Sequence, residues 1–90
     1  RDVSSLDLLR RVYDVLSGHG VTILNIDSVV ICEKPRILPH VDAMKAAISR
    51  ALGDLKPERI GIKGKTTEGL GFTGRREGMA AQAVALVRFN

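Results

Sequence analysis

The chain has 90 residues, which is enough for one small domain and too few for two. It is 44% hydrophobic with a formal net charge of +4, which favours an anionic partner such as nucleic acid, a nucleotide or a phosphorylated metabolite. It contains no run of ~18 apolar residues that could span a membrane and no signal-peptide pattern, and its single cysteine, Cys32, cannot form an internal disulfide, which predicts a reducing compartment.

The first third of the chain predicts a helix followed by a strand. Ser4 and Ser5 are typical helix-starting residues, and Asp7 is placed to favour the positive end of the helix dipole. Apolar residues then recur at three- and four-residue spacing and predict one buried face: Leu6, Leu9, Val12, Tyr13 and Leu16. Gly18 or Gly20 can end this helix. The β-branched run 21–32 predicts a long strand, with Asn25 and Asp27 on the opposite face from Leu24 and Ile26.

The middle of the chain predicts an ordered loop or an edge strand, then a second helix and a short strand. Two prolines in residues 33–40 exclude a central strand there. Val41, Met44, Ile48 and Leu52 mark an amphipathic helix that Gly53 ends. A turn opens at Pro57, and Ile60 and Ile62 form a short strand that leads into a glycine-rich loop.

The last apolar segment, residues 79–89, is ambiguous between helix and strand, but its closing part, 84–89, favours a strand because the two earlier strands need a partner. The predicted order is therefore α-β-α-β-loop-β in a single domain, residues 1–90. This order predicts an α+β fold: a two-layer sandwich with an antiparallel or mixed sheet and both helices on one face.

The glycine-rich loop, TTEGLGFTGR at 66–75, matches two nucleotide-binding patterns. GLGFTG fits the dinucleotide pattern G-x-G-x-x-G, but too little chain follows for a second parallel strand and its acidic residue. GFTG fits the GXXG loop of RNA-binding KH modules, although the residues before it are poor helix formers, and Glu68 and Glu77 would repel an RNA backbone. A non-catalytic basic α+β module that binds RNA through this loop remains the alternative function.

The same loop has the chemistry of a diphosphate site. Its glycines allow close approach of the backbone, and the hydroxyls of Thr66 and Thr67 can donate to phosphate oxygens. Arg75 offers a fork of donors, and Glu68 can hold a divalent metal ion.

Three stretches of the chain carry a resemblance to a known family: LPH at 38–40, KGKTTEGLGFTGRREG at 63–78 and AAQAVALV at 80–87. In this order and spacing they resemble the C-terminal part of the 2-C-methyl-D-erythritol 2,4-cyclodiphosphate synthases, whose loop usually has the pattern K-A-T-T-T-E-x-L-G-F-T-G-R-G-E-G. The resemblance covers essentially the whole chain. It implies an enzyme of the non-mevalonate isoprenoid pathway, in a bacterial cytoplasm or, in a plastid-bearing organism, in the plastid.

The reaction implied by the resemblance is a metal-dependent cyclisation by a phosphorus-oxygen lyase. The 2-phosphate of 4-diphosphocytidyl-2-C-methyl-D-erythritol 2-phosphate attacks the β-phosphorus, and CMP leaves. The family uses a zinc ion and a magnesium or manganese ion, and it forms homotrimers with sites between subunits. The partners expected from the resemblance are thus a cytidine-diphosphate substrate and two further copies of the chain, with no nucleic acid and no membrane.

The resemblance also assigns site residues. The segment 32–38 matches the family's cytidine pocket, which is formed largely by backbone groups: Cys32, Glu33, Lys34, Pro35, Arg36, Ile37 and Leu38. Thr66 matches the threonine that stabilises the transition state, and Glu68 matches the ligand of the magnesium-type ion. Further substrate contacts match Lys65, Thr67, Phe72 and Arg75. For Phe72 a place in the core is the alternative, and Arg75 and Glu77 alternatively form a charge pair at the subunit interface.

Some positions depart from the family pattern. Lys65 replaces the first of three threonines, where it can pair with the diphosphate or point to solvent. Gly64 replaces an alanine, and Arg76 replaces a glycine beside the subunit axis. The family binds zinc through an Asp-x-His pair and a further histidine, whereas His19 and His40 lie in no such motif. We therefore expect no zinc ligand in this chain, and we expect the zinc-binding part to lie upstream of Arg1.

Overall fold

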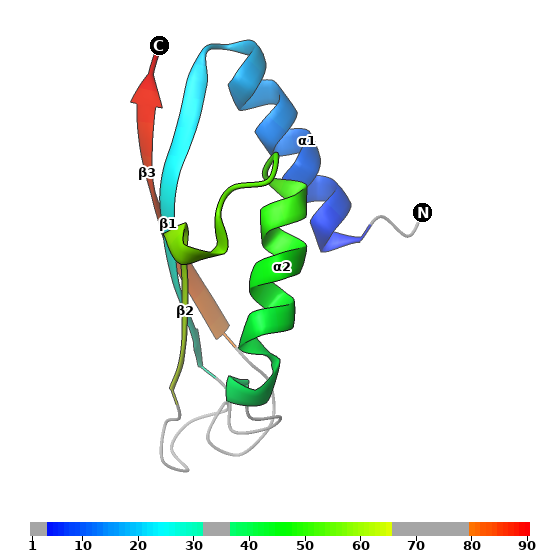
Figure 1. The fold of residues 1–90 in the computed structure, drawn as a ribbon, viewed down its shortest axis with the longest axis vertical. Helices are drawn as coiled ribbons and strands as arrows, with labels where there is room; N and C mark the ends of the chain where they lie inside the picture. The colour runs from blue at the N-terminus through cyan, green and yellow to red at the C-terminus, as the bar shows by residue number, and fades with distance from the viewer. Residues whose placement is uncertain (1–3, 32–36, 66–79) are drawn as a thin grey trace.

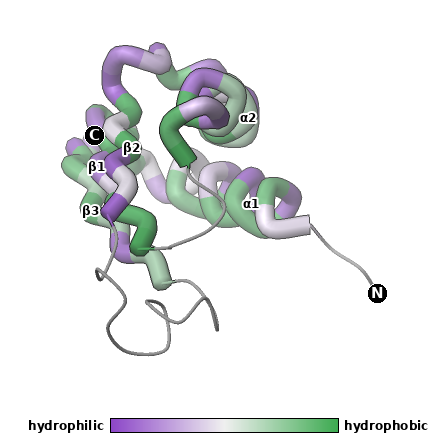
Figure 2. The backbone as a smooth tube through the Cα atoms, turned by 90° about the horizontal axis from the view of Figure 1, so that it is seen from below, coloured by the Kyte–Doolittle hydropathy of each residue, from purple (hydrophilic) through white to green (hydrophobic). Residues whose placement is uncertain are grey.

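The computed structural model of the chain describes residues 4–31, 37–65 and 80–90. In these residues two helices pack against a sheet formed by three strands (Figure 1). The elements are α1 (Ser5–Gly18), β1 (Val21–Ile31), α2 (Val41–Ala51), β2 (Ile60–Lys65) and β3 (Ala80–Phe89), with short 3₁₀ helices at Leu38–His40 and Pro57–Arg59. Both helices lie on the same side of the sheet, as the view from below also shows (Figure 2). The predicted α+β class and the element order are confirmed.

The sheet is mixed, and the long strand β1 occupies its centre in the order β2-β1-β3. Strand β1 runs parallel to β2 and antiparallel to β3. The register with β3 shifts between Ile23 and Asn25, so Leu24 is an extra residue in β1. The Arg59 guanidinium donates a hydrogen bond of 3.3 Å to the Leu24 carbonyl, which gives this carbonyl a partner at the irregularity.

Both helices begin and end as the sequence predicts. Ser4 is the N-cap of α1, and its side-chain oxygen accepts a hydrogen bond from the Asp7 backbone N–H at 3.1 Å. After α1 the chain reverses at Gly20, which has a φ of +75°, and after α2 it reverses at Gly53, which has a φ of +67°. These left-handed conformations favour glycine, so both glycines stop a helix and turn the chain back toward the sheet.

The core lies between α2 and the sheet. The buried apolar side chains of the described residues are Ala51, Leu52 and Ile60. From α1, Leu9, Tyr13 and Leu16 are half-buried.

The predicted apolar face of α1 was too wide, because Leu6 is 42% exposed and Val12 is 53% exposed. Both residues lie roughly 60° to either side of the line through the half-buried residues Leu9, Tyr13 and Leu16.

Candidate functional site

Most of the predicted site residues lie outside the part of the chain that the structure describes. These are Cys32, Glu33, Lys34, Pro35, Arg36, Thr66, Thr67, Glu68, Phe72 and Arg75. The structure does place Ile37, Leu38 and Lys65, which are the ends of the two predicted substrate-binding segments. The site geometry is therefore built from these three residues and the strands that carry them.

The two predicted segments leave the sheet at the same edge. Strands β1 and β2 are parallel neighbours, and their last paired residues are Ile31 and Lys65. Residues 32 and 66 are covalently joined to this pair, so both segments begin at the carboxyl ends of adjacent strands. In open sheets with parallel strands, ligands commonly bind beyond this end.

Ile37 brings the far end of the first segment back to strand β2. A Cβ built on Gly64 would lie 2.7 Å from Ile37 Cγ1 and 3.1 Å from Cδ1, so the Ile37 side chain occupies the space beside Gly64. The Ile37 carbonyl accepts a hydrogen bond of 2.8 Å from the His40 backbone N–H, which closes the 3₁₀ turn that leads into α2. Ile37 thus contacts β2 at Gly64, the residue before Lys65, and its carbonyl takes part in the turn that leads into α2.

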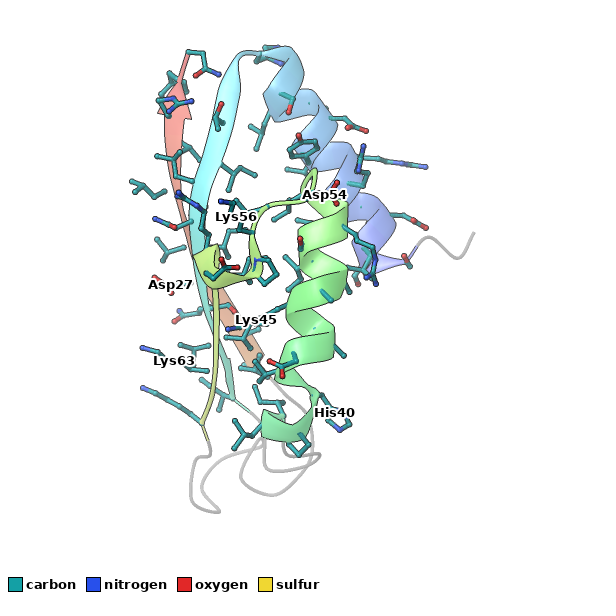
Figure 3. The ribbon with its side chains drawn as sticks, viewed as in Figure 1. Asp27, His40, Lys45, Asp54, Lys56 and Lys63 are labelled. Atoms are coloured by element: carbon teal, nitrogen blue, oxygen red, sulfur yellow. The ribbon has the colours of Figure 1, made fainter. Side chains whose placement is uncertain are left out.

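The neighbouring side chains give this end of the sheet a positive charge. Lys63 and Lys65 are exposed, and because they are two residues apart in β2 they lie on the same face. Lys45 of α2 and Lys63 lie in the same half of the molecule, toward the carboxyl end of β2 (Figure 3). Leu38 is 83% exposed and leaves an apolar side chain at the surface here. Lys63 and Lys65 lie on the face of β2 opposite Gly64, and ammonium groups at this end of the sheet suit a phosphate ligand.

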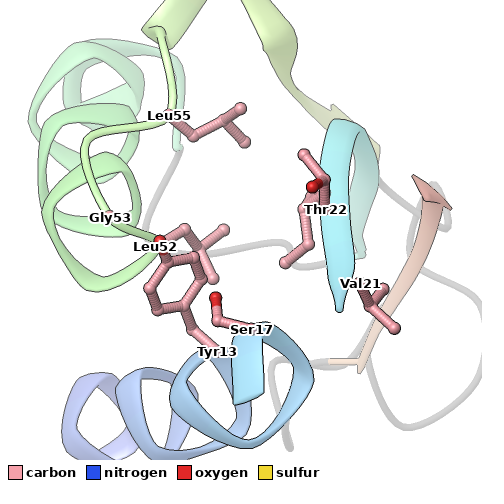
Figure 4. Close-up of a pocket in the computed structure, with 8 residues that line it drawn as sticks. Tyr13, Ser17, Val21, Thr22, Leu52, Gly53 and Leu55 are labelled. Atoms are coloured by element: carbon pink, nitrogen blue, oxygen red, sulfur yellow. The ribbon is translucent and has the colours of Figure 1, made fainter. Parts of the chain in front are cut away.

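A separate hollow of about 170 Å³ lies near the start of β1, at the opposite end of the sheet (Figure 4). Its lining residues come from the end of α1, the start of β1 and the turn after α2: Tyr13, Ser17, Val21, Thr22, Ile23, Leu52, Gly53 and Leu55. These residues supply three hydroxyl groups and no charge. The hollow therefore does not suit a diphosphate.

Neither histidine belongs to a metal site in the described part of the chain. His19 Nδ1 lies 2.8 Å from the Val15 carbonyl oxygen, so the ring packs on the last turn of α1. His40 occupies the N-cap position of α2 without a side-chain cap hydrogen bond. Residues 4–31, 37–65 and 80–90 contain no group of three His, Cys, Asp or Glu side chains that could hold a metal ion. These described residues do not fit a zinc site.

The family of the chain follows from comparison with known proteins. The model of the YgbB family matches residues 1–88. The chain belongs to the YgbB family. Its relatives include the 2-C-methyl-D-erythritol 2,4-cyclodiphosphate synthases of Dehalococcoides mccartyi strain CBDB1, which is 48% identical over 87 residues, and of Aromatoleum aromaticum, which is 52% identical over 80 residues. The matches cover 97% and 89% of this chain but 55% and 48% of the two relatives. The chain thus spans about half the length of these YgbB proteins.

Solved structures of the synthase have the same fold as this YgbB chain. The synthase from Plasmodium vivax superposes with a TM-score of 0.92 at 34% identity, covering 97% of this chain and 57% of that protein. A synthase in its CDP-bound form superposes with a TM-score of 0.84 at 30% identity, covering 98% of this chain and 55% of that protein. Among the helices of the described residues, none is long and apolar enough to cross a membrane.

Sequence reasoning missed the contact between Ile37 and Gly64, which joins the two predicted segments. It also left open whether the strands pair in parallel. The signal for parallel pairing was present, because a strand, a helix and a second strand follow one another in residues 21–65, and this order favours a parallel crossover. No comparable pattern in the sequence indicates which side chain lies over Gly64.

Proposed function

We propose that the protein is a 2-C-methyl-D-erythritol 2,4-cyclodiphosphate synthase of the non-mevalonate isoprenoid pathway, acting in a bacterial cytoplasm. It converts 4-diphosphocytidyl-2-C-methyl-D-erythritol 2-phosphate to the 2,4-cyclodiphosphate and releases CMP. The names of the YgbB relatives support this activity. The structural observation that carries the proposal is the shared edge of β1 and β2, where the two predicted binding segments begin beside Lys65.

The reaction forms one phosphorus-oxygen bond and breaks another, and the substrate supplies its own nucleophile. An oxygen of the 2-phosphate attacks the β-phosphorus, and the bond from that phosphorus to the oxygen of CMP breaks, so CMP carries away the electron pair. The protein holds the attacking and leaving oxygens in line and neutralises their charge. In this proposal the segment 32–38 binds the cytidine, while Lys65, Thr66, Thr67 and Arg75 hold the diphosphate and Phe72 makes a further contact.

The proposal includes metal ions, because phosphoryl transfer commonly uses them to neutralise charge. We assign Glu68 as the ligand of a Mg²⁺ or Mn²⁺ ion, since a carboxylate suits these hard cations. A zinc ion belongs to the proposed enzyme as well, and we assign no ligand for it among these 90 residues. The chain's own contribution is therefore the cytidine and diphosphate part of the site.

The proposal also includes a homotrimer with sites between subunits. Support comes from strand β3, which lies at the edge of the sheet and exposes large apolar side chains. Val84 is 73% exposed, Leu86 is 57% exposed and Phe89 is 79% exposed. Exposed apolar side chains gathered on one edge strand are typical of a surface that another copy covers.

The test of ligand class is a calorimetric titration of the natural full-length gene product. One titration uses CDP with Mg²⁺, and a parallel one uses a short single-stranded RNA. We expect saturable binding of CDP at one site per subunit and no comparable heat from RNA. Tight RNA binding without CDP binding would refute the synthase and favour the GXXG alternative.

The test of the chemistry is Thr66→Ala in the same protein. Removing a hydroxyl that stabilises the transition state should lower kcat by about 100-fold, with an unchanged trimer in sedimentation. The matched control is Thr22→Ala, because Thr22 lies at the far end of β1, where its hydroxyl accepts a hydrogen bond from Asn90 at 2.8 Å. Turnover near the wild-type value in the Thr66 variant would contradict the role assigned to this hydroxyl.

A further inference from the structure

We propose that the hollow near the start of β1 is a binding site for one small uncharged molecule with an apolar body and a single hydroxyl group, such as a phenol. The hollow has a volume of about 170 Å³ and lies between the end of α1, the turn after α2 and β1 (Figure 4). It is at the opposite end of the sheet from Lys65, so this site is separate from the proposed substrate site. Every residue that lines it belongs to the described part of the chain.

The size and the walls of the hollow determine the apolar body of the ligand. An apolar cavity of about 150 Å³ can hold one benzene ring, so a hollow of about 170 Å³ has room for one ring and a small substituent. Leu52 is 3% exposed and forms the inner wall, while Val21, Ile23 and Leu55 are half-buried. A ring placed among these side chains removes apolar surface from water, which is the main source of affinity for such a ligand.

The Ser17 hydroxyl is the polar group that can pair with the ligand. Ser17 lies at the end of α1, and Figure 4 shows its side chain pointing toward the space between the turn after α2 and β1. The other two hydroxyls of the lining are engaged. That of Tyr13 lies directly against Gly53, and that of Thr22 accepts a 2.8 Å hydrogen bond from Asn90. A serine hydroxyl can both donate and accept, so it suits the neutral hydroxyl of a phenol.

The backbone around the hollow is held in place, which opposes its closure. Gly53, in the turn after α2, has a φ of +67°. On the other side the Gly20 carbonyl accepts a 2.7 Å hydrogen bond from the Asn90 backbone N–H. The Arg10 guanidinium donates a 3.3 Å hydrogen bond to the Arg50 carbonyl and so joins α1 to the end of α2. Since protein structure relaxes only partly around a void, walls tied in this way leave room for a ligand.

The ligand class is tested with phenol and benzoate, followed by the methyl NMR signals of the natural full-length gene product. We expect phenol to bind with a dissociation constant of about 1 mM, as suits so small a ligand, and to shift the methyl signals of Val21, Ile23 and Leu55. The methyl signals of Val84 and Leu86, on the opposite face of the sheet, are the control and should not move. Benzoate should bind about tenfold more weakly or less, because its carboxylate would leave water without an ion-pair partner in the lining.

Ser17→Ala tests the hydrogen bond. It should weaken phenol binding about fivefold and leave the binding of toluene unchanged, because toluene has no hydroxyl that loses a partner. The matched control is Tyr13→Phe, which removes a hydroxyl of the same hollow that lies against Gly53. This control should keep the affinity for phenol within about twofold of the wild-type value.

Leu55→Trp tests the location, because a larger side chain from the turn fills the hollow. Phenol and toluene should then no longer bind, while circular dichroism stays that of the wild type. If this variant does not fold, Ser17→Ala decides, since alanine preserves the helix. The proposal is overturned if phenol shifts none of the methyl signals of the hollow, if Ser17→Ala binds phenol as the wild type does, or if folded Leu55→Trp still binds it. Displacement of phenol by CDP would place phenol in the proposed substrate site and would also overturn the proposal.

Discussion

The two strands that flank β1 lie in very different surroundings. On one side β2 lies beneath α2, where Ile60 is 1% exposed and Leu52, at the end of the helix, is 3% exposed. On the other side β3 has one half-buried residue, Val87, and its other residues are exposed. Both strands pair with β1 over most of their length, so the difference lies in side-chain packing and not in hydrogen bonding.

The sequence of β3 explains why its apolar residues stay exposed. Side chains alternate across a strand, and Ala81, Ala83 and Ala85 pair with Val30, Ser28 and Ile26 of β1, so these small side chains share a face with the packed residue Ile26. The larger side chains of Val84 and Leu86 belong to the opposite face, away from the helices. The β2 side therefore supplies the core of the described chain. The β3 side leaves an exposed apolar surface that a partner surface can cover.

The largest expected loss of stability from a single substitution is at Ile60, on the β2 side of the sheet. Ile60→Ala removes a fully buried side chain between α2 and the sheet, and we expect it to lower the free energy of unfolding by about 2–5 kcal/mol. Denaturant titration followed by circular dichroism measures the change. A loss below about 1 kcal/mol, as expected for a surface residue, would contradict the assignment of the core to this side.

The next largest effect is expected at Gly53, where the turn after α2 meets α1. Its φ of +67° disfavours a side chain, and a Cβ there would overlap the hydroxyl end of Tyr13. The Arg10 guanidinium lies over the Tyr13 ring, 5.4 Å from the ring centroid. We expect Gly53→Ala to cost about 1–3 kcal/mol of stability, measured by the same titration.

Gly18→Ala is the matched control for this substitution, because Gly18 ends α1 without a positive φ and has space for a Cβ. It should be neutral or slightly stabilising. Equal losses of stability in both variants would contradict this prediction. They would show that the junction of α1 and α2 accommodates a methyl group at Gly53 beside Tyr13.

The sequence predicts this fold well where local chemistry decides the structure. Ser4 and Asp7 marked the start of α1, Gly20 and Gly53 marked the turns, and the spacing of Val41, Met44 and Ile48 marked α2. Each of these signals acts over a few residues, so a single sequence contains it in full. Strand β3 was ambiguous because apolar alanine-rich segments suit both helix and strand, and only pairing with β1 decides.

The sequence predicts less where distant segments meet. The resemblance predicts two binding segments, but nothing in residues 32–38 indicates that Ile37 lies against Gly64, because that contact depends on how α2 returns the chain to β2. The width of the buried face of α1 was overestimated for the same reason. Leu6 and Val12 are apolar and correctly spaced, yet their exposure is set by how much neighbouring surface reaches them.

The smallest effect on the free energy of unfolding is expected on the open face of β3, which is the face that carries Val84 and Leu86 and points away from the helices. Two valines on this strand make a matched pair. Val84 is 73% exposed, whereas Val87 is half-buried on the face that Ala85 shares. Replacing valine by threonine keeps the shape and the strand preference but puts a hydroxyl in place of a methyl group. Val87→Thr should cost about 1 kcal/mol in the dissociated protein, and Val84→Thr less than about 0.5 kcal/mol, because water already reaches Val84.

Sedimentation of the same two variants should reverse this order. If further copies of the chain cover the open face of β3, a hydroxyl at Val84 lies in the interface and weakens association, while one at Val87 leaves association nearly unchanged. Equal sedimentation of Val84→Thr and the wild type across a concentration series would exclude this face from the interface. A loss of several kcal/mol for Val84→Thr in the dissociated protein would instead show that the open face of β3 packs within one subunit, and the contrast between the two sides of β1 would then disappear.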